Sequence, residues 1–362
     1  MKSFKIGDLT ISVPIIQGGM GVGISLSGLA SAVATEGGVG VISCAGLGLL
    51  YPRSAKDYFS SCIAGLKEEI HKARAKTSGT IGVNIMVVLS NFSDMVKTSI
   101  AEKVDIIFSG AGLPLDLPGY LQKDSTTKLV PIVSSARAAR LICDKWMANY
   151  NYLPDAIVVE GPKAGGHLGY KLTQINDEKF SLESVVPEVV AQIKIYEEKY
   201  SRKIPIIAAG GLMTGEDIYK ILELGATAVQ LGSKFVTTTE CDAAMEFKET
   251  YLKSTKSDIE IINSPVGMPG RAINGEFIER VKEGKTKPKN CPFNCIKSCD
   301  HTKSAYCIIL ALFNAAKGNL KRGYAFAGSN AYLSEKITSV KETIDALKNE
   351  YDNYSNKMEL KK

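Results

Sequence analysis

The stretch from Ala156 to Gly169 brings a carboxylate and a histidine together in one glycine-rich segment. The apolar run Ala156-Ile-Val-Val is typical of a buried strand, and it ends at Glu160. The loop that follows holds four glycines around His167, which is the one of the chain's three histidines on such a turn. Imidazole exchanges protons near pH 7, and flanking glycines leave it open to a substrate. We therefore expect His167 to be catalytic; the alternative is a structural histidine that hydrogen-bonds a carboxylate such as Glu160.

Two more glycine-bearing turns have the pattern of a phosphate site, and each follows a predicted buried strand. In a (β/α)8 barrel, the loops after the seventh and eighth strands commonly bind phosphate through backbone N–H groups. The alternative is that the glycines only permit tight turns between a strand and a helix. The candidates for phosphate binding are Gly210, Gly211, Gln230, Leu231, Gly232 and Ser233.

Asn84 is a polar residue in an otherwise apolar strand, Gly82-Val-Asn-Ile-Met86. A buried amide without a partner costs roughly 1–3 kcal/mol, so Asn84 should have one. A flavin ring offers matching carbonyl and N–H groups, and a main-chain group of a neighbouring strand is the alternative.

The elements that position these residues alternate between short apolar runs and segments with helical spacing. Such runs, bounded by Gly, Pro or Asp, are typical of parallel strands that are buried on both faces. The predicted strands are residues 13–16, 39–42, 81–85, 106–108, 130–133, 156–159, 204–208 and 228–231. The predicted helices between and after them are 26–34, 58–75, 93–101, 136–147, 182–200 and 215–224. Eight alternations predict an α/β protein of the (β/α)8 or TIM-barrel class.

An open, doubly wound sheet is the competing fold. Gly18-Gly-Met-Gly21-Val-Gly23 follows the first strand and superficially suits a dinucleotide. Its glycines lack the G-x-G-x-x-G spacing, however, and no acidic residue closes a second strand about 20 residues further on.

The sequence changes character after residue 245. We predict a barrel over residues 1–245 and a helical extension over 246–362 that packs on the barrel and covers one of its mouths. Within the extension, Asn263 to Arg271 is predicted to be an irregular loop, and no strand is expected. Helices are expected up to Lys256, from Tyr306 to Ala316 and from Lys336 to Tyr351.

Composition limits the classes of function. An apolar content of 45%, a charged content of 23% and a net charge of +6 are those of a soluble globular protein. No basic stripe with interleaved aromatics indicates nucleic acid, and no apolar run of about 18 residues indicates a membrane span. The first residues lack the apolar region of a signal peptide. We expect a cytoplasmic protein with reduced cysteines.

Four of the eight cysteines, Cys291, Cys295, Cys299 and Cys307, fall close together. Their spacing does not match the pairs of common zinc sites or the usual ferredoxin run. On a continuous helix the first three thiols would share a face, and with Cys307 or His301 they could hold zinc or an iron–sulfur cluster. The favoured interpretation is free thiols that pack as small hydrophobic groups.

Taken together, the motifs resemble those of the FMN-dependent nitronate monooxygenases, formerly 2-nitropropane dioxygenases, and of the closely similar FMN-dependent enoyl-ACP reductases. The resemblance covers about residues 4 to 245. Its motifs are Pro14-Ile-Ile-Gln17-Gly, Gly82-Val-Asn84-Ile-Met86, Glu160-Gly-x-x-Ala-Gly-Gly-His167-x-Gly169, Ala208-Ala-Gly-Gly211 and Gln230-x-Gly232-Ser-x-Phe235.

The resemblance implies a TIM barrel with FMN, whose phosphate lies at Gly211 and the turn from Gln230 to Ser233. It places Asn84 on the flavin and makes His167 catalytic. The other expected cofactor-binding residues are Gln17, Gly18, Gly19, Met20, Glu160, Gly165 and Gly166.

Two positions depart from the family pattern. Leu168 stands where the monooxygenases usually have Arg, which removes a cation that would help to hold an anionic substrate. Ser233 stands where Thr is usual, and it keeps the hydroxyl.

The expected activity is oxidation of alkyl nitronates with dioxygen to a carbonyl compound and nitrite. One alternative is reduction of an enoyl thioester, with NAD(P)H as co-substrate. A second alternative is a barrel that only binds flavin or a phosphorylated metabolite. A homodimer is compatible with the sequence, which does not determine the assembly.

Overall fold

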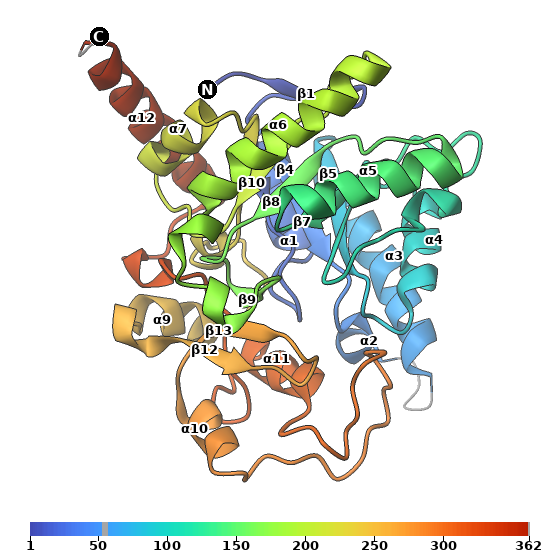
Figure 1. Cartoon of the computed structure of the whole chain (residues 1–362). Helices are drawn as coiled ribbons and strands as arrows, with labels where there is room; N and C mark the ends of the chain where they lie inside the picture. Colours follow the sequence, from blue (N-terminus) through green and yellow to red (C-terminus); the bar gives the residue numbers. More distant parts are fainter. Residues whose placement is uncertain (53–56, 361–362) are drawn as a thin grey trace.

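The protein folds around a closed barrel of eight parallel strands (Figure 1). The computed structural model describes residues 1–52 and 57–360, so the last two residues of the predicted extension lie outside the described part. Successive barrel strands lie side by side, and β11 pairs with β3 to close the ring. The (β/α)8 prediction and all eight predicted strands are confirmed. The barrel strands are β3 (Ile15–Gln17), β4 (Val39–Ser43), β5 (Thr80–Met86), β6 (Ile106–Gly110), β7 (Lys128–Val133), β8 (Ile157–Glu160), β10 (Ile206–Ala209) and β11 (Ala228–Leu231).

The inside of the barrel is filled by apolar side chains from alternate strand positions, including Ile16, Val41 and Phe108. A hairpin of β1 (Phe4–Ile6) and β2 (Leu9–Ile11) packs Phe4 and Ile6 into the same cluster. Figure 1 shows this hairpin at the end of the barrel opposite residues 259–316. This hairpin was not predicted, because three-residue strands are too short to show a periodic pattern.

The helices form an outer ring, and the last of them comes from the C-terminus. Helix α8 is a single turn, too short to cover the gap between α7 and α1. Helix α12 packs against both of these neighbours, as Figure 1 shows for α7. Gly215 permits the close approach, since a Cβ there would lie 2.2 Å from the backbone nitrogen of Tyr351. The helices of this ring are α1 (Ser27–Thr35), α2 (Leu47–Leu50), α3 (Tyr58–Lys76), α4 (Phe92–Ala101), α5 (Ala136–Tyr150), α6 (Leu182–Tyr200), α7 (Gly215–Glu223), α8 (Ser233–Val236) and α12 (Val340–Glu359).

The rest of the extension lies beyond the carboxyl ends of the strands, and it is not purely helical (Figure 1). The expectation that it adds no strand is wrong, because β12 and β13 form an antiparallel hairpin across the predicted loop. The reason is tertiary: β13 pairs with β9, a two-residue strand that contains His167. The division at residue 245 stays a prediction. The elements concerned are β9 (Gly166–His167), α9 (Met245–Lys253), β12 (Ile259–Asn263), β13 (Pro269–Ile273), α10 (Glu276–Lys282) and α11 (Ile308–Ala316).

The cysteine-bearing segment between α10 and α11 has no helix, so the arrangement of three thiols on one helical face does not occur. Cys295 is buried, and its carbonyl oxygen accepts a hydrogen bond from Ser90 N (3.1 Å). Burial raises the pKa of its thiol to about 12. Within residues 1–52 and 57–360, no group of three or more His, Cys, Asp or Glu side chains is arranged to hold a metal ion. No helix in those ranges has the length and apolar character needed to cross a membrane.

Candidate active site

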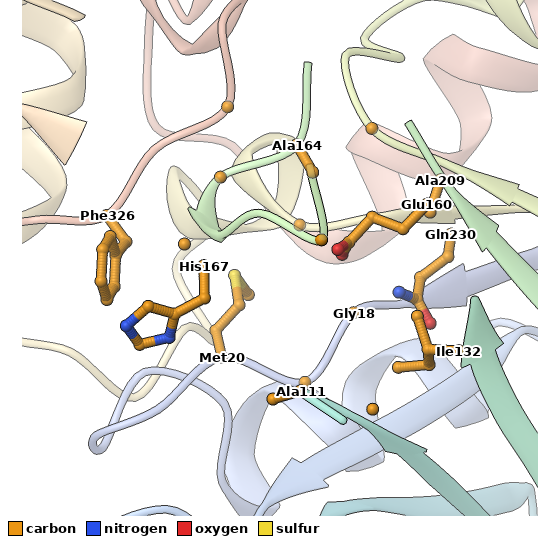
Figure 2. Close-up of a pocket in the computed structure, with 18 of the residues that line it drawn as sticks. Gly18, Met20, Ala111, Ile132, Glu160, Ala164, His167, Ala209, Gln230 and Phe326 are labelled. Carbon is orange, nitrogen blue, oxygen red and sulfur yellow. The ribbon is translucent and has the colours of Figure 1, made fainter. Parts of the chain in front are cut away.

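A cavity of about 630 Å³ lies at the carboxyl ends of the barrel strands (Figure 2). This volume is within the range of small-molecule and cofactor sites. The predicted site residues that line it are Gly18, Gly19, Met20, Asn84, Glu160, Gly165, Gly166, His167, Gly210, Gly211, Gln230, Leu231, Gly232 and Ser233.

Gln17 is the one predicted site residue that is not part of the cavity wall. Its side chain is fully buried between β3 and β4, where Oε1 accepts a hydrogen bond from Val41 N (2.9 Å). Its Nε2 donates to the carbonyl oxygen of Gly18. Gln17 therefore shapes the turn that carries the cavity residues and does not itself reach the cavity.

Three polar side chains on the barrel rim face the cavity and form no hydrogen bond with residues that the structure describes. Glu160 is level with Ala209 on β10, and Ala209 is level with Gln230 on β11. The small Ala209 leaves the two longer side chains room to face one side of the cavity (Figure 2). Asn84 on β5 is the third. No hydrogen bond to these three side chains is formed within the described part of the chain, so they are available to a bound molecule.

Glu160 is the acidic member of this group. Burial raises the pKa of its carboxyl group to about 7. Near neutral pH the group can therefore donate or accept a hydrogen bond. Tyr170 also closes this part of the cavity, and its hydroxyl donates to the main-chain oxygen of Glu160 (2.8 Å).

The glycine turns form another part of the wall. Gly210 and Gly211 have φ angles of +104° and +83°, which a residue with a Cβ rarely adopts. Asn330 Nδ2 donates to Gly211 O (2.6 Å) and holds this turn against the C-terminal loop. Ser233 Oγ accepts from Gly328 N (2.9 Å), which leaves its hydroxyl hydrogen free to donate to a ligand.

Gly232, within the turn from Gln230 to Ser233, leaves open space. A Cβ there would meet only Met20 Sδ, at 3.6 Å. No lysine or arginine lines the cavity among the residues that the structure describes. A phosphate would therefore be held by backbone N–H groups and the Ser233 hydroxyl.

His167 is positioned by the C-terminal hairpin. It pairs with Gly270 of β13, and the next residue, Leu168, donates its N–H to Pro269 O (2.8 Å). The ring nitrogen Nε2 lies 2.7 Å from Ser264 Oγ. Its partner is thus a hydroxyl group and not Glu160, which Figure 2 draws well apart from it.

The surroundings of the His167 ring keep it uncharged. Its ring packs edge-on against Phe326, with centroids 5.1 Å apart. Burial lowers the pKa of His167 to about 4, so the imidazole is neutral at pH 7.

Arg271 fastens the His167 loop to the hairpin. Its buried guanidinium donates through Nη1 to Pro162 O (2.5 Å) and Ala164 O (2.7 Å). Burial lowers its pKa to about 10. Arg271 therefore supplies a hydrogen-bond donor to two carbonyl groups of this irregular loop.

The donor set fits a flavin. Two unpaired amides and a carboxyl group on the rim match the carbonyl and N–H groups of its pyrimidine ring, and the glycine turns match a phosphate. Sequence reasoning predicted that the extension covers one mouth of the barrel, but it did not identify the residues that the extension adds to the cavity wall. The added residues are Phe247, Tyr251, Met268, Leu312, Phe326, Ala327, Gly328, Asn330 and Ala331.

Enzymes with the (β/α)8 fold carry their active sites at the carboxyl ends of the barrel strands. The polar cavity residues of this protein lie at the same place. The nitronate monooxygenase family model matches residues 2–102 and 90–350, and the chain belongs to that family. The protein is a flavin oxidoreductase.

Individual relatives agree with this family. A probable nitronate monooxygenase of Staphylococcus haemolyticus is 28% identical, over 77% of this chain and 81% of its own length. The structure of FabK from Thermotoga maritima is also 28% identical, with a TM-score of 0.73 and 96% of each chain covered. A nitroalkane oxidase from Streptomyces ansochromogenes, at 19% identity and a TM-score of 0.72, covers 96% of this chain and 97% of its own and shares the fold.

Proposed function

We propose that the protein is an FMN-dependent nitronate monooxygenase that oxidises alkyl nitronates with dioxygen to a carbonyl compound and nitrite. The observation that carries the proposal is the neutral imidazole of His167, which faces a cavity whose rim holds unpaired flavin-type partners. Family membership supports it. We also propose that FMN is bound by the cofactor-binding residues predicted from the sequence.

The roles of the residues follow from their positions. Bound FMN would carry electrons between the organic substrate and dioxygen. Asn84 and Gln230 would hydrogen-bond its ring, and the turns at Gly211 and Ser233 would hold its phosphate. His167 would bind the substrate, while Met268, Leu312 and Phe326 exclude water from that side.

The test is His167→Ala, with His71→Ala as its control. His71 is exposed on α3, where it pairs with Glu102. We expect kcat/KM for an alkyl nitronate to fall by about 10²–10³-fold in His167→Ala, because one positioned hydrogen-bond donor is lost, with FMN affinity unchanged. An unchanged rate would remove His167 from the reaction, and loss of FMN would show that it serves cofactor binding.

Enoyl-ACP reduction is the second candidate. It is favoured by the absence of lysine and arginine from the described cavity wall, which suits a neutral thioester better than an anion. Leu168, directly after His167, is apolar and buried. The likeness to FabK and to an enoyl reductase domain, at a TM-score of 0.67, is compatible with it.

An anaerobic titration separates the two candidates. Under the first proposal, flavin absorbance is expected to bleach with an alkyl nitronate and to return in air. Bleaching by NADH or NADPH alone would favour the reductase. No flavin band, even after FMN is added, would contradict both.

A further inference from the structure

We propose that Ser264 fixes the tautomer of His167, so that Nδ1 carries the proton and His167 donates a hydrogen bond to an oxygen atom of the substrate. Ser264 is thus a positioning residue, contributed by the C-terminal hairpin from 97 residues further along the chain. The identity of that oxygen, a nitronate oxygen, rests on the proposed function; the tautomer does not.

The first step is the hydrogen-bond accounting at Ser264. Its Oγ accepts from Val266 N (3.4 Å) and lies 2.7 Å from His167 Nε2. A hydroxyl group has one hydrogen to donate. Among the residues that the structure describes, Ser264 Oγ forms no hydrogen bond to any other acceptor. Since Ser264 is buried, an unpaired hydroxyl hydrogen would be costly, so Ser264 donates to Nε2.

The second step concerns the other ring nitrogen. A neutral imidazole that accepts at Nε2 must carry its proton at Nδ1. Nδ1 of His167 has no partner in the described part of the protein, and the residue lines the cavity. The backbone pairing with Gly270 and the ring contact with Phe326 restrain the side chain, so the Nδ1–H group is held in place for a ligand.

The third step is chemical. A nitrogen that already carries a proton cannot remove one from carbon, so His167 in this state is not the base for a neutral nitroalkane. Glu160 is drawn apart from it in Figure 2, among the flavin-type partners. A nitronate needs no base, because its carbon is already deprotonated, and its oxygens are strong acceptors. The arrangement therefore selects substrates that present an acceptor oxygen beside His167.

The experiment uses full-length protein with ¹⁵N-labelled histidine. With three histidines in the chain, His71→Gln and His301→Gln assign the His167 signals by elimination. At pH 7 we expect a pyrrole-type Nδ1 and a pyridine-type Nε2 for His167. Ser264→Ala should move both signals toward the other tautomer, and Ser264→Thr, which keeps the hydroxyl, should restore them. A protonated Nε2 in the wild type, or no change in Ser264→Ala, would overturn the proposal.

Turnover supplies the second readout. Ser264→Ala should lower kcat/KM for an alkyl nitronate about tenfold, equivalent to about 1.4 kcal/mol, and Ser264→Thr should recover most of it. The wild type should oxidise the nitronate much faster than the matching neutral nitroalkane; equal rates would contradict the substrate preference. If the tautomer is as expected but no nitronate reduces the flavin, the proposed function fails and the role of Ser264 stands.

Discussion

Two sides of the same cavity are built in opposite ways. On the barrel rim, the side chains of Asn84, Glu160 and Gln230 face the cavity with no protein partner in the described residues. On the opposite side, Nε2 of His167 lies beside Ser264, its backbone pairs with Gly270 and its ring contacts Phe326. We call the side formed by His167, Ser264, Gly270 and Phe326 the histidine wall. The unpaired side chains of the rim suit a large polar ligand, whereas the contacts in the histidine wall hold one imidazole in a fixed orientation.

The largest effects should come from substitutions at two glycines, one of which should lower stability and the other FMN affinity. A Cβ at Gly40 would lie 1.7 Å from Ala30 O, so Gly40→Ala should cost about 3–5 kcal/mol of stability. A Cβ at Gly232 would enter open space, so Gly232→Ala should fold normally and lower FMN affinity at least about tenfold, as one methyl group displaces the ligand. Thermal unfolding and FMN titration test both. Normal FMN binding by Gly232→Ala would place the phosphate elsewhere.

On the histidine wall, Arg271→Met should leave the carbonyl oxygens of Pro162 and Ala164 unpaired. We expect a loss of about 2–4 kcal/mol in the free energy of unfolding and a lower kcat, with FMN affinity less affected. Arg280→Met is the control, since Arg280 is only half-buried and its Nη1 donates to Lys321 O (3.1 Å), away from the His167 loop. If both variants unfold alike in urea, Arg271 does not fasten the loop.

The two sides should also respond to pH with opposite sign in flavin-free protein. The pKa of His167 is lowered to about 4, so the unfolded chain binds the extra proton and stability is lost as pH falls from about 6.5 toward 4. The pKa of Glu160 is raised to about 7, so the folded chain binds the proton more readily and stability is lost as pH rises from about 4.5 through 7.

Two variants separate these contributions. His167→Gln should gain stability over the wild type at low pH, and Glu160→Gln should gain at high pH, each by up to about 3 kcal/mol. Melting temperatures across this pH range measure both differences. Parallel changes in the two variants would contradict the assignment.

The smallest effect concerns the amides near β3 and β5. Asn84→Ala should weaken FMN binding about fivefold, or about 1 kcal/mol, and leave flavin-free stability unchanged, because its amide makes no hydrogen bond with the described residues. Gln17→Leu should do the reverse, since it leaves Val41 N and Gly18 O unpaired within the barrel. Equal FMN affinities in Asn84→Ala and the wild type would remove Asn84 from the cofactor site.

Much of the barrel side could be predicted from local pattern. The eight strands were found because a parallel strand covered on both faces must be apolar throughout. The rim residues followed from their place at the ends of those strands. Gln17 shows the limit of this reasoning, because a position beside the site does not reveal which way a side chain points.

The histidine wall could be predicted only in part. His167 itself stands out by its glycines, but Ser264 looked like one residue of an irregular loop. Strand β9 has two residues and exists only through its pairing with β13. The outer ring of helices also depends on a segment far along the chain, because α12 fills the place that the single-turn α8 leaves empty.

By itself, then, the sequence determined the strands, the glycine turns and the histidine, because burial and backbone freedom are local requirements that each residue type meets or fails. Tertiary structure alone decided what the histidine touches, which nitrogen carries its proton and what closes the cavity. Those depend on pairings between segments far apart in the chain, whose hydrogen bonds leave no periodic pattern in either segment.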